Sequence, residues 1–144
     1  MKKLDVSENP LLERLECEWN EIEKLDTTNS PELTILWCHE NLLLELDVTK
    51  NPALTELRCT GNQLYKLDTS KCPELKTLEC EKNELISLDL EQNTKLEGLW
   101  CDEDIMQLDV SHCPNLITLG VNVDTVVIGA YEDMTIVSNE DEEP

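Results

Sequence analysis

Residues 46–66 are LDVTKNPALTELRCTGNQLYK, and the same arrangement of apolar residues returns along the chain at nearly constant spacing. Within this stretch the pattern is L-x-x-L-x-C-x-x-N-x-L, formed by Leu54, Leu57, Cys59, Asn62 and Leu64. Copies open at Leu4, Leu25, Leu46, Leu67, Leu88 and Leu108, in steps of 21, 21, 21, 21 and 20 residues. A fixed period of this size predicts a solenoid, in which stacked copies share one continuous core.

Each copy contains a short segment in which apolar and polar residues alternate. In a strand, successive side chains point to opposite faces. We therefore expect Leu15 and Cys17 to point into the core, and Arg14, Glu16 and Glu18 to point outward. Equivalent strands are predicted around 35–39, 56–60, 77–81, 98–102 and 118–122. The predicted fold is a right-handed coil with a parallel β-sheet on the concave face and turns or 3₁₀ segments on the convex face.

The other half of each copy opens with Leu-Asp, and its residues do not favour a β-strand. We expect its aspartates to accept hydrogen bonds from backbone N–H groups one or two residues on, as Asp commonly does in turns. A cation-binding ladder is the disfavoured alternative, because the turn position is the same in every copy. The aspartates are Asp5, Asp26, Asp47, Asp68, Asp89 and Asp109. Asn20, Asn41, Asn62 and Asn83 are expected to bond the backbone of neighbouring turns in the same structural way.

Together these residues give the leucine-rich repeat signature, with cysteine in place of its third leucine. The pattern LDVS-x-N-x-x-L-x-x-L-x-C-x-x-N-x-L resembles the bacterial internalin-type repeats, especially the cysteine-ladder variety, over residues 4–122. Members of that group are mostly surface proteins that bind host or cell-surface partners through the concave sheet, so the resemblance implies a protein-binding role. The chain departs from the group in having no helical N-terminal cap, immunoglobulin-like junction or wall-anchoring signal.

We divide the chain into leucine-rich repeats (1–122), a C-terminal β cap (123–137) and an acidic disordered tail (138–144). Two short β-prone runs around Gly129 suggest a hairpin-like cap over the last coil. One residue is missing between Cys101 and Leu108, where Asp104 replaces the usual Asn, and this predicts a local distortion. As the chain stands we expect a cytoplasmic protein; as a fragment of a longer internalin-like protein it would be secreted or on the cell surface.

The cysteines are expected to be structural. Cys17, Cys38, Cys59, Cys80 and Cys101 recur every 21 residues, which stacks them inside the coil as buried free thiols. Disulfides and metal binding are disfavoured, because five thiols in line cannot all pair and no C-x-x-C occurs. The remaining two, Cys72 and Cys113, are expected near a turn, and a thiol reagent should label the native protein at most at these two positions.

Charge and motifs exclude several function classes. A formal charge of −21 argues against direct binding to nucleic acid or to an anionic membrane, because both need Lys and Arg. No apolar run approaches the roughly 20 residues that span a bilayer. Neither a Gly-rich phosphate loop nor a nucleophile elbow is present, so we expect no enzyme and no cofactor.

The outward positions of the predicted sheet carry two tryptophans. Trp37 and Trp100 share one column about 14 Å apart, and Trp19 lies just beyond the first strand. Trp together with Arg is typical of interface hot spots. We therefore expect a protein–protein interaction module that binds a macromolecular partner through this face. The candidate partner-binding residues are Ile35, Trp37, His39, Arg58, Glu79, Trp100 and Asp102.

Three alternatives stay open for this face. The tryptophans could simply cover neighbouring backbone. The protein could be an acidic decoy that inhibits an enzyme by occupying its basic nucleic-acid-binding groove. An unpaired edge strand could also form a homodimer.

Overall fold

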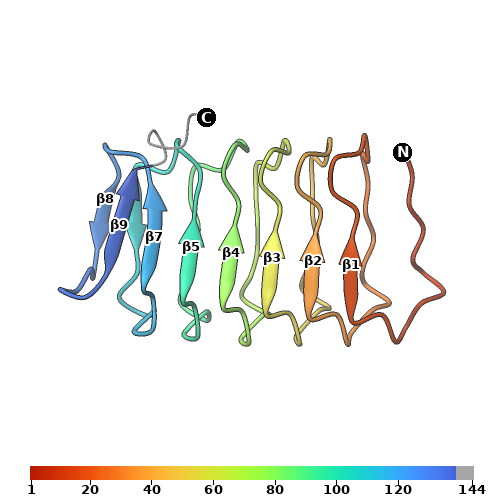
Figure 1. Cartoon of the computed structure of the whole chain (residues 1–144), viewed down its shortest axis with the longest axis horizontal. Coiled ribbons are helices and arrows are strands. Elements are labelled where there is room, and N and C mark those ends of the chain that lie inside the picture. The colour runs from red at the N-terminus through yellow and green to blue at the C-terminus, as the bar shows by residue number, and fades with distance from the viewer. Residues whose placement is uncertain (139–144) are drawn as a thin grey trace.

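A computed structural model describes residues 1–138 and has the predicted solenoid architecture (Figure 1). Its main feature is a seven-stranded parallel sheet in the order β1-β2-β3-β4-β5-β7-β9. The strands are β1 (Arg14–Glu16), β2 (Ile35–Trp37), β3 (Glu56–Arg58), β4 (Thr77–Glu79), β5 (Gly98–Trp100), β7 (Thr118–Val121) and β9 (Thr135–Ser138). The six predicted strand positions are confirmed, and β9 adds a seventh.

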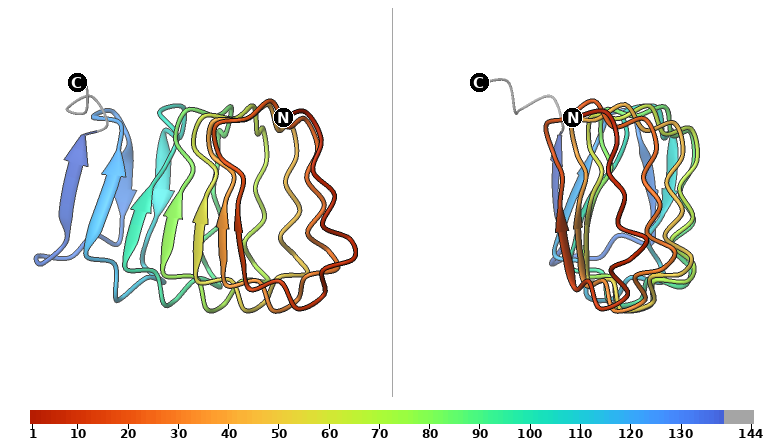
Figure 2. Two further views of the ribbon diagram at one scale, coloured as in Figure 1. Left: turned by 45° about the vertical axis from the view of Figure 1, so that its right-hand side comes forward. Right: turned by 90° about the vertical axis from the view of Figure 1, so that its right-hand side faces the viewer.

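Viewed along its axis, the coil has the large sheet on one side and mostly irregular turns on the other (Figure 2). In most copies the convex side consists of two successive tight turns, such as Asn9 N to Val6 O at 3.0 Å and Leu12 N to Asn9 O at 3.1 Å. Turns therefore fill the place where turns or 3₁₀ segments were expected. Among the residues described, no helix is long and apolar enough to cross a membrane.

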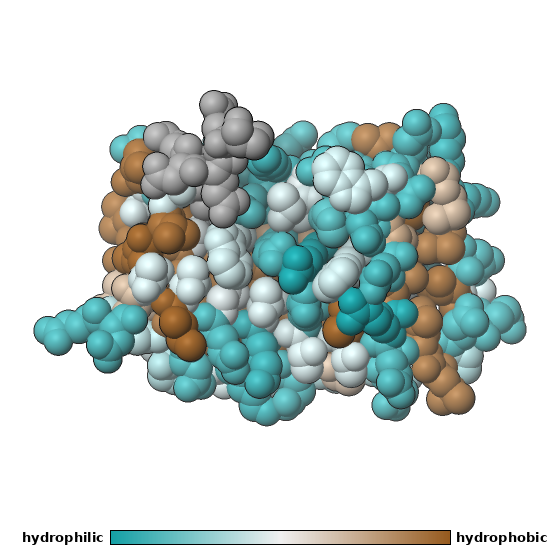
Figure 3. All heavy atoms as spheres, in the orientation of Figure 1, coloured by the Kyte–Doolittle hydropathy of each residue, from teal (hydrophilic) through white to brown (hydrophobic). Residues whose placement is uncertain are grey.

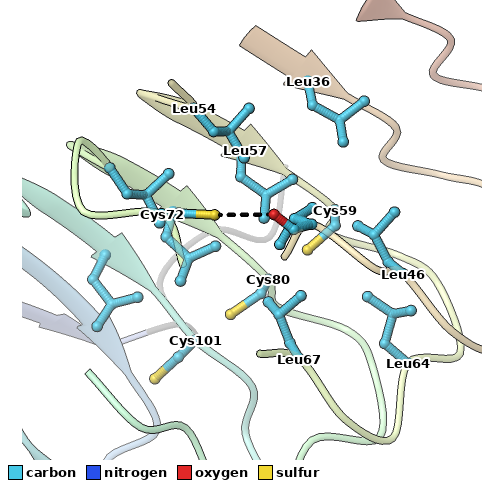
Figure 4. Close-up of a cluster of buried hydrophobic side chains, with 14 of the residues drawn as sticks. Leu36, Leu46, Leu54, Leu57, Cys59, Leu64, Leu67, Cys72, Cys80 and Cys101 are labelled. Atoms are coloured by element: carbon cyan, nitrogen blue, oxygen red, sulfur yellow. Dashed lines mark hydrogen bonds between the residues drawn. The ribbon is translucent and has the colours of Figure 1, made fainter. Parts of the chain in front are cut away.

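The core consists of stacked rows of identical or similar side chains. Strand pairing places one leucine from each coil in a single buried row, formed by Leu15, Leu36, Leu57, Leu78, Leu99 and Leu119. The predicted cysteine ladder runs beside it, and Cys59, Cys80 and Cys101 are seen one after another in Figure 4. Cys38, Cys59, Cys80 and Cys101 are 0% exposed. All seven cysteines are free thiols. The stacking and burial of the ladder are thus confirmed.

Cys72 and Cys113, the two cysteines at which labelling of the native protein was expected at most, are buried like the ladder cysteines. Both side chains are 0% exposed, because this repeat position points inward beneath the convex turns. The Cys72 thiol donates to the Val48 carbonyl at 3.4 Å, drawn as the dashed line in Figure 4. Burial raises the pKa of Cys17, Cys72 and Cys113 to about 11 and that of Cys101 to about 12. The pKa values of Cys38, Cys59 and Cys80 are also raised by burial.

The aspartates that open each copy cap turns, as predicted. Each accepts a hydrogen bond from the backbone N–H two residues on, for example Thr49 N to Asp47 Oδ1 at 2.9 Å. The Thr49 hydroxyl donates to the same oxygen. These bonds lower the pKa of Asp47 below its ordinary value. The equivalent backbone bonds are made by Asp5, Asp26, Asp68, Asp89 and Asp109.

The predicted asparagine ladder closes the ends of β2, β3 and β4, whereas Asn20 after β1 donates to the Cys17 and Glu18 carbonyls of its own coil instead of a neighbouring one. The Asn62 amide group donates to the Cys38 and Cys59 carbonyls at 3.1 and 3.0 Å, and its Oδ1 accepts from Leu43 N at 3.0 Å. Asn41 and Asn83 bridge their neighbouring coils in the same way. The ladder therefore ties each coil to its neighbour through the backbone.

A second polar row on the convex side alternates from coil to coil. The Thr27 hydroxyl donates to Asn51 Oδ1 at 2.9 Å, and the Thr69 hydroxyl donates to Asn93 Oδ1 at 2.7 Å. In the intervening coils the threonine is replaced by an apolar residue and the asparagine by Ser or Cys. Those matched pairs are Val6 with Ser30, Val48 with Cys72, and Leu90 with Cys113. This row of paired side chains therefore repeats every two coils, from Val6 to Cys113.

The C-terminal segment does not form the expected hairpin. Strand β8 (Val126–Ile128) pairs in parallel with β6 (Gln107–Asp109) on the convex side, whereas β9 pairs in parallel with β7 in the large sheet. The chain thus continues as a further coil instead of reversing. Gly129 permits this stacking, because its φ is +81° and a Cβ there would lie 2.6 Å from the Ser111 backbone. Of the predicted acidic tail, residues 139–144 lie outside the described part of the chain.

Candidate protein-binding face

The outward side of the large sheet, here called the open sheet face, corresponds to the concave face of the sequence prediction. Parallel pairing without any register shift aligns its side chains in columns. The middle column contains Glu16, Trp37, Arg58, Glu79, Trp100 and Gly120. Figure 3 shows this side as mostly hydrophilic, with hydrophobic patches toward its two ends.

Trp37 is the centre of a closely packed cluster. The guanidinium carbons of Arg14 and Arg58, from the two neighbouring strands, lie 4.5 and 4.7 Å from its ring centroid. Its indole N–H donates to Glu56 Oε1 at 2.8 Å, and Arg58 Nε donates to the same oxygen at 2.7 Å. Arg58 also lies 3.4 Å from Glu79. Cation–π contacts and shared ion pairs therefore hold the tryptophan in one orientation.

Trp100 lies differently, with its ring over the backbone of Gly98. A Cβ at Gly98 would come within 2.8 Å of Cζ3 of the indole ring. The glycine thus leaves the space that the ring occupies. Trp100 therefore covers neighbouring backbone, which was one of the alternatives left open by the sequence. Its side chain is also partly exposed.

The third column, at the carboxyl end of the strands, contains polar atoms without partners. Glu18 Oε2, His39 Nδ1 and Thr60 Oγ1 are buried and have no hydrogen-bond partner. Trp19 stands beside this column with its ring edge-on to His39, at a centroid distance of 6.3 Å and an interplanar angle of 81°. Unpartnered buried polar atoms are rare in native proteins.

One predicted site residue does not lie on this face. The Asp102 side chain is 1% exposed and accepts hydrogen bonds from the N–H groups of Asn83, Leu85 and Glu103 at 3.1, 2.9 and 3.0 Å. In the shortened copy it performs the accepting part of the ladder asparagine's role, because a carboxylate has no N–H to donate to the cysteine carbonyls, and Asp104 was the residue expected at that position from the sequence. Desolvation raises its pKa, and the N–H bonds oppose that change.

Five other candidates occupy outward positions of the large sheet, namely Ile35, Trp37, Arg58, Glu79 and Trp100. The sixth, His39, lies two residues beyond the end of β2. Sequence reasoning left out Arg14 and Glu56, which complete the Trp37 cluster. The 21-residue period could have identified both, because it places them on strands that flank Trp37.

The convex side carries an exposed apolar row that sequence reasoning also missed. Leu44, Tyr65, Ile86 and Met106 are 55, 55, 75 and 61% exposed. Each stands two residues before a Leu-Asp pair, and that fixed offset was the available signal. We call this row the convex ridge. Among the described residues, no group of three or more His, Cys, Asp or Glu side chains is placed to hold a metal ion.

Comparison with solved structures yields internalins. The functional domain of InlJ from Listeria monocytogenes, which includes a cysteine ladder, matches with a TM-score of 0.80 and 35% identity over 93% of this chain and 33% of that one. The chain is a leucine-rich repeat solenoid of the internalin-like, cysteine-ladder type. It spans about a third of the length of that InlJ domain.

Two further structures share the fold of this internalin-like solenoid. The internalin InlF from L. monocytogenes matches with a TM-score of 0.75 and 18% identity, over 85% of this chain and 37% of that one. The leucine-rich repeat domain of APL1B gives a TM-score of 0.73 and 20% identity, over 94% and 44%. No protein-family model matches the chain, and neither does any curated protein. The structural neighbours support a protein-interaction module in general.

Proposed function

We propose that the protein is a non-enzymatic interaction module that binds a protein partner through the open sheet face. The observation that carries this proposal is the Trp37 cluster, in which Arg14 and Arg58 cover the ring and Glu56 accepts its N–H. Because these side chains are already ordered, binding requires little further loss of conformational entropy. Trp and Arg are also the residues most enriched at interface hot spots.

A protein partner suits the chemistry of this face better than a small molecule or a nucleic acid does. The face is broad, and its two partly exposed tryptophans lie three strands apart in one column. Arg14 and Arg58 are paired with Glu16, Glu56 and Glu79, so they have no free charge for phosphates. The partner would contact Trp37 and Trp100 as anchors, with Ile35, His39, Arg58 and Glu79 around them.

The proposal is tested by identifying a partner with a photo-crosslinker at Thr77, between the two tryptophans, and then titrating variants. Trp37→Ala and Trp100→Ala should each weaken binding by about 2 kcal/mol, roughly 30-fold. Gly98→Ala should also weaken it, because the added methyl displaces the Trp100 ring. Circular dichroism and thermal unfolding establish that each variant is folded.

The matched controls are Tyr65→Ala and Ile86→Ala on the convex ridge, which also remove large exposed side chains. They should leave affinity unchanged. Loss of binding in these controls, with full binding by both tryptophan variants, would place the interface on the convex side. A collapse of affinity with added salt, without any effect of the tryptophans, would instead indicate long-range attraction to the acidic chain.

A further inference from the structure

We propose that Glu18, Trp19, His39 and Thr60 form a subsite that binds a basic side chain, Lys or Arg, of the protein partner. This inference rests on the proposed function, because the subsite lies at one end of the open sheet face. It specifies the chemistry that the partner must present there.

The first observation is the conformation of Trp19. Its φ is +55°, in the left-handed region that residues with a Cβ rarely adopt. The equivalent turn position in later coils is also left-handed, at Glu40, Gly61 and Lys82. The repeat therefore requires this backbone shape, and glycine satisfies it in one coil.

Packing does not account for the tryptophan at this position. The Trp19 side chain is 74% exposed, and its ring contacts His39 edge-on. The other coils place an acidic residue, a glycine or a basic residue there without altering the fold. An aromatic ring held at the rim in this way is available for a partner, and cations bind favourably to the face of an indole.

The second observation is the set of unpartnered atoms beside the ring. Backbone bonds from Trp19 N to His39 O at 3.1 Å and from Glu40 N to Thr60 O at 2.9 Å keep the three strands in register beyond their formal ends. Glu18, His39 and Thr60 therefore stand side by side. Glu18 Oε2, His39 Nδ1 and Thr60 Oγ1 can all accept hydrogen bonds, and all three lack a partner.

Charge complementarity selects a basic group. The two arginines of the open sheet face are already paired with Glu16, Glu56 and Glu79. Glu18 thus brings a negative charge with one buried unpartnered oxygen, next to an aromatic ring and two further acceptors. A guanidinium or ammonium group supplies several N–H donors and a positive charge, and charge-assisted bonds of this kind are the strong ones. An acidic or apolar partner residue would leave the Glu18 oxygen without a donor, because a carboxylate can only accept.

The test is an NMR titration of the ¹⁵N-labelled full chain with the peptide acetyl-Gly-Arg-Gly-amide. The matched probe contains citrulline in place of arginine, which keeps the shape and removes the charge. We expect saturable shifts centred on the Trp19 indole and on His39 and Thr60 with the arginine peptide only. Shifts spread evenly over the acidic surface, or equal shifts with citrulline, would overturn the proposal.

Variants separate the subsite from general attraction to an acidic protein. Glu18→Gln and Trp19→Ala should each lower the affinity for the arginine peptide by about fivefold or more. Glu91→Gln removes the same charge from an exposed convex turn and should have no effect. If Glu91→Gln weakens binding of the arginine peptide as much as Glu18→Gln does, the proposed subsite is refuted.

The two proposals fail in different ways. If Trp37→Ala and Trp100→Ala weaken binding of the partner but Glu18→Gln and Trp19→Ala do not, the subsite is refuted and the proposed function stands. If only variants of the convex ridge weaken binding of the partner, the proposed function fails. In that case the peptide titration still decides whether the subsite binds a basic side chain.

Discussion

Raising the pH should unfold this protein through its cysteines. The ordinary thiol pKa is 9.0, whereas burial raises it to about 11 for Cys17, Cys72 and Cys113 and to about 12 for Cys101. Above pH 9.0 the unfolded chain therefore releases thiol protons that the folded chain retains. Because the unfolded state then binds fewer protons, the free energy of unfolding decreases as the pH rises.

The magnitude follows from the number of buried thiols. One pH unit above the unfolded pKa, each thiol costs about 1.4 kcal/mol of stability. The seven free, buried cysteines together would cost about 10 kcal/mol. This is comparable to the whole stability of a typical domain, about 5–15 kcal/mol. We therefore expect cooperative unfolding near pH 10, about one unit above the ordinary thiol pKa.

Urea titrations at a series of pH values, followed by circular dichroism, measure this dependence. The expected result is a steep fall in the denaturation midpoint above pH 9.0, the ordinary thiol pKa. Variants such as Cys59→Ala and Cys72→Ala should be less stable at neutral pH but should show a shallower pH dependence. A midpoint that stays constant to about pH 10 would refute the reasoning, because it would mean that the folded thiols ionise as readily as unfolded ones.

Three further predictions concern the ladders and caps. In the native protein a thiol reagent should react slowly and first at Cys17, which is 5% exposed, and Cys72 and Cys113 should react only after denaturation; rapid native labelling of the latter pair would contradict their burial. Asn62→Ala should destabilise by about 2–3 kcal/mol, because Leu43 N–H loses its acceptor while the Cys38 and Cys59 carbonyls each keep a second asparagine donor; urea unfolding measures this, with exposed Gln63→Ala as the control. Asp47→Ala should destabilise at neutral pH, and its difference from wild type should narrow as the pH falls below 3.8, because the lowered pKa of Asp47 stabilises the fold only while the carboxylate is charged. A difference that persists at low pH would show that the hydrogen bonds of the charged carboxylate are not its cause.

The sequence predicts the repeated parts of the fold well, because each coil experiences the same environment as its neighbours. Leu57 and Cys59 recur at a constant step, so their burial in rows follows from the period alone. Where the step changes, that logic fails. With one residue fewer, the chain turns earlier after Cys101, and the carboxylate at Asp102 takes the three N–H groups.

The candidate site was less predictable than the fold. Alternation placed Trp37 on the open sheet face, but the contacts of its ring depend on neighbouring strands. The position of the Trp100 ring depends instead on a residue of its own strand, because the missing Cβ of Gly98 leaves the space that the ring occupies. The sequence also did not show that β8 pairs with β6 and β9 with β7. Two short β-prone runs are compatible with either a hairpin or a further coil.

The convex row of threonine and asparagine implies that coils can be added to or removed from this solenoid only in pairs. Removing residues 67–87 would set Asn93 against Val48 and bury an amide oxygen without its hydroxyl donor. Removing residues 46–87 would set Asn93 against Thr27, which restores the bond that Asn51 makes now. The 42-residue pair of coils is thus the smallest segment whose duplication or deletion keeps every Thr–Asn hydrogen bond between the coils that become neighbours. A history of tandem duplication in this chain would therefore be recorded as an even number of coils gained or lost.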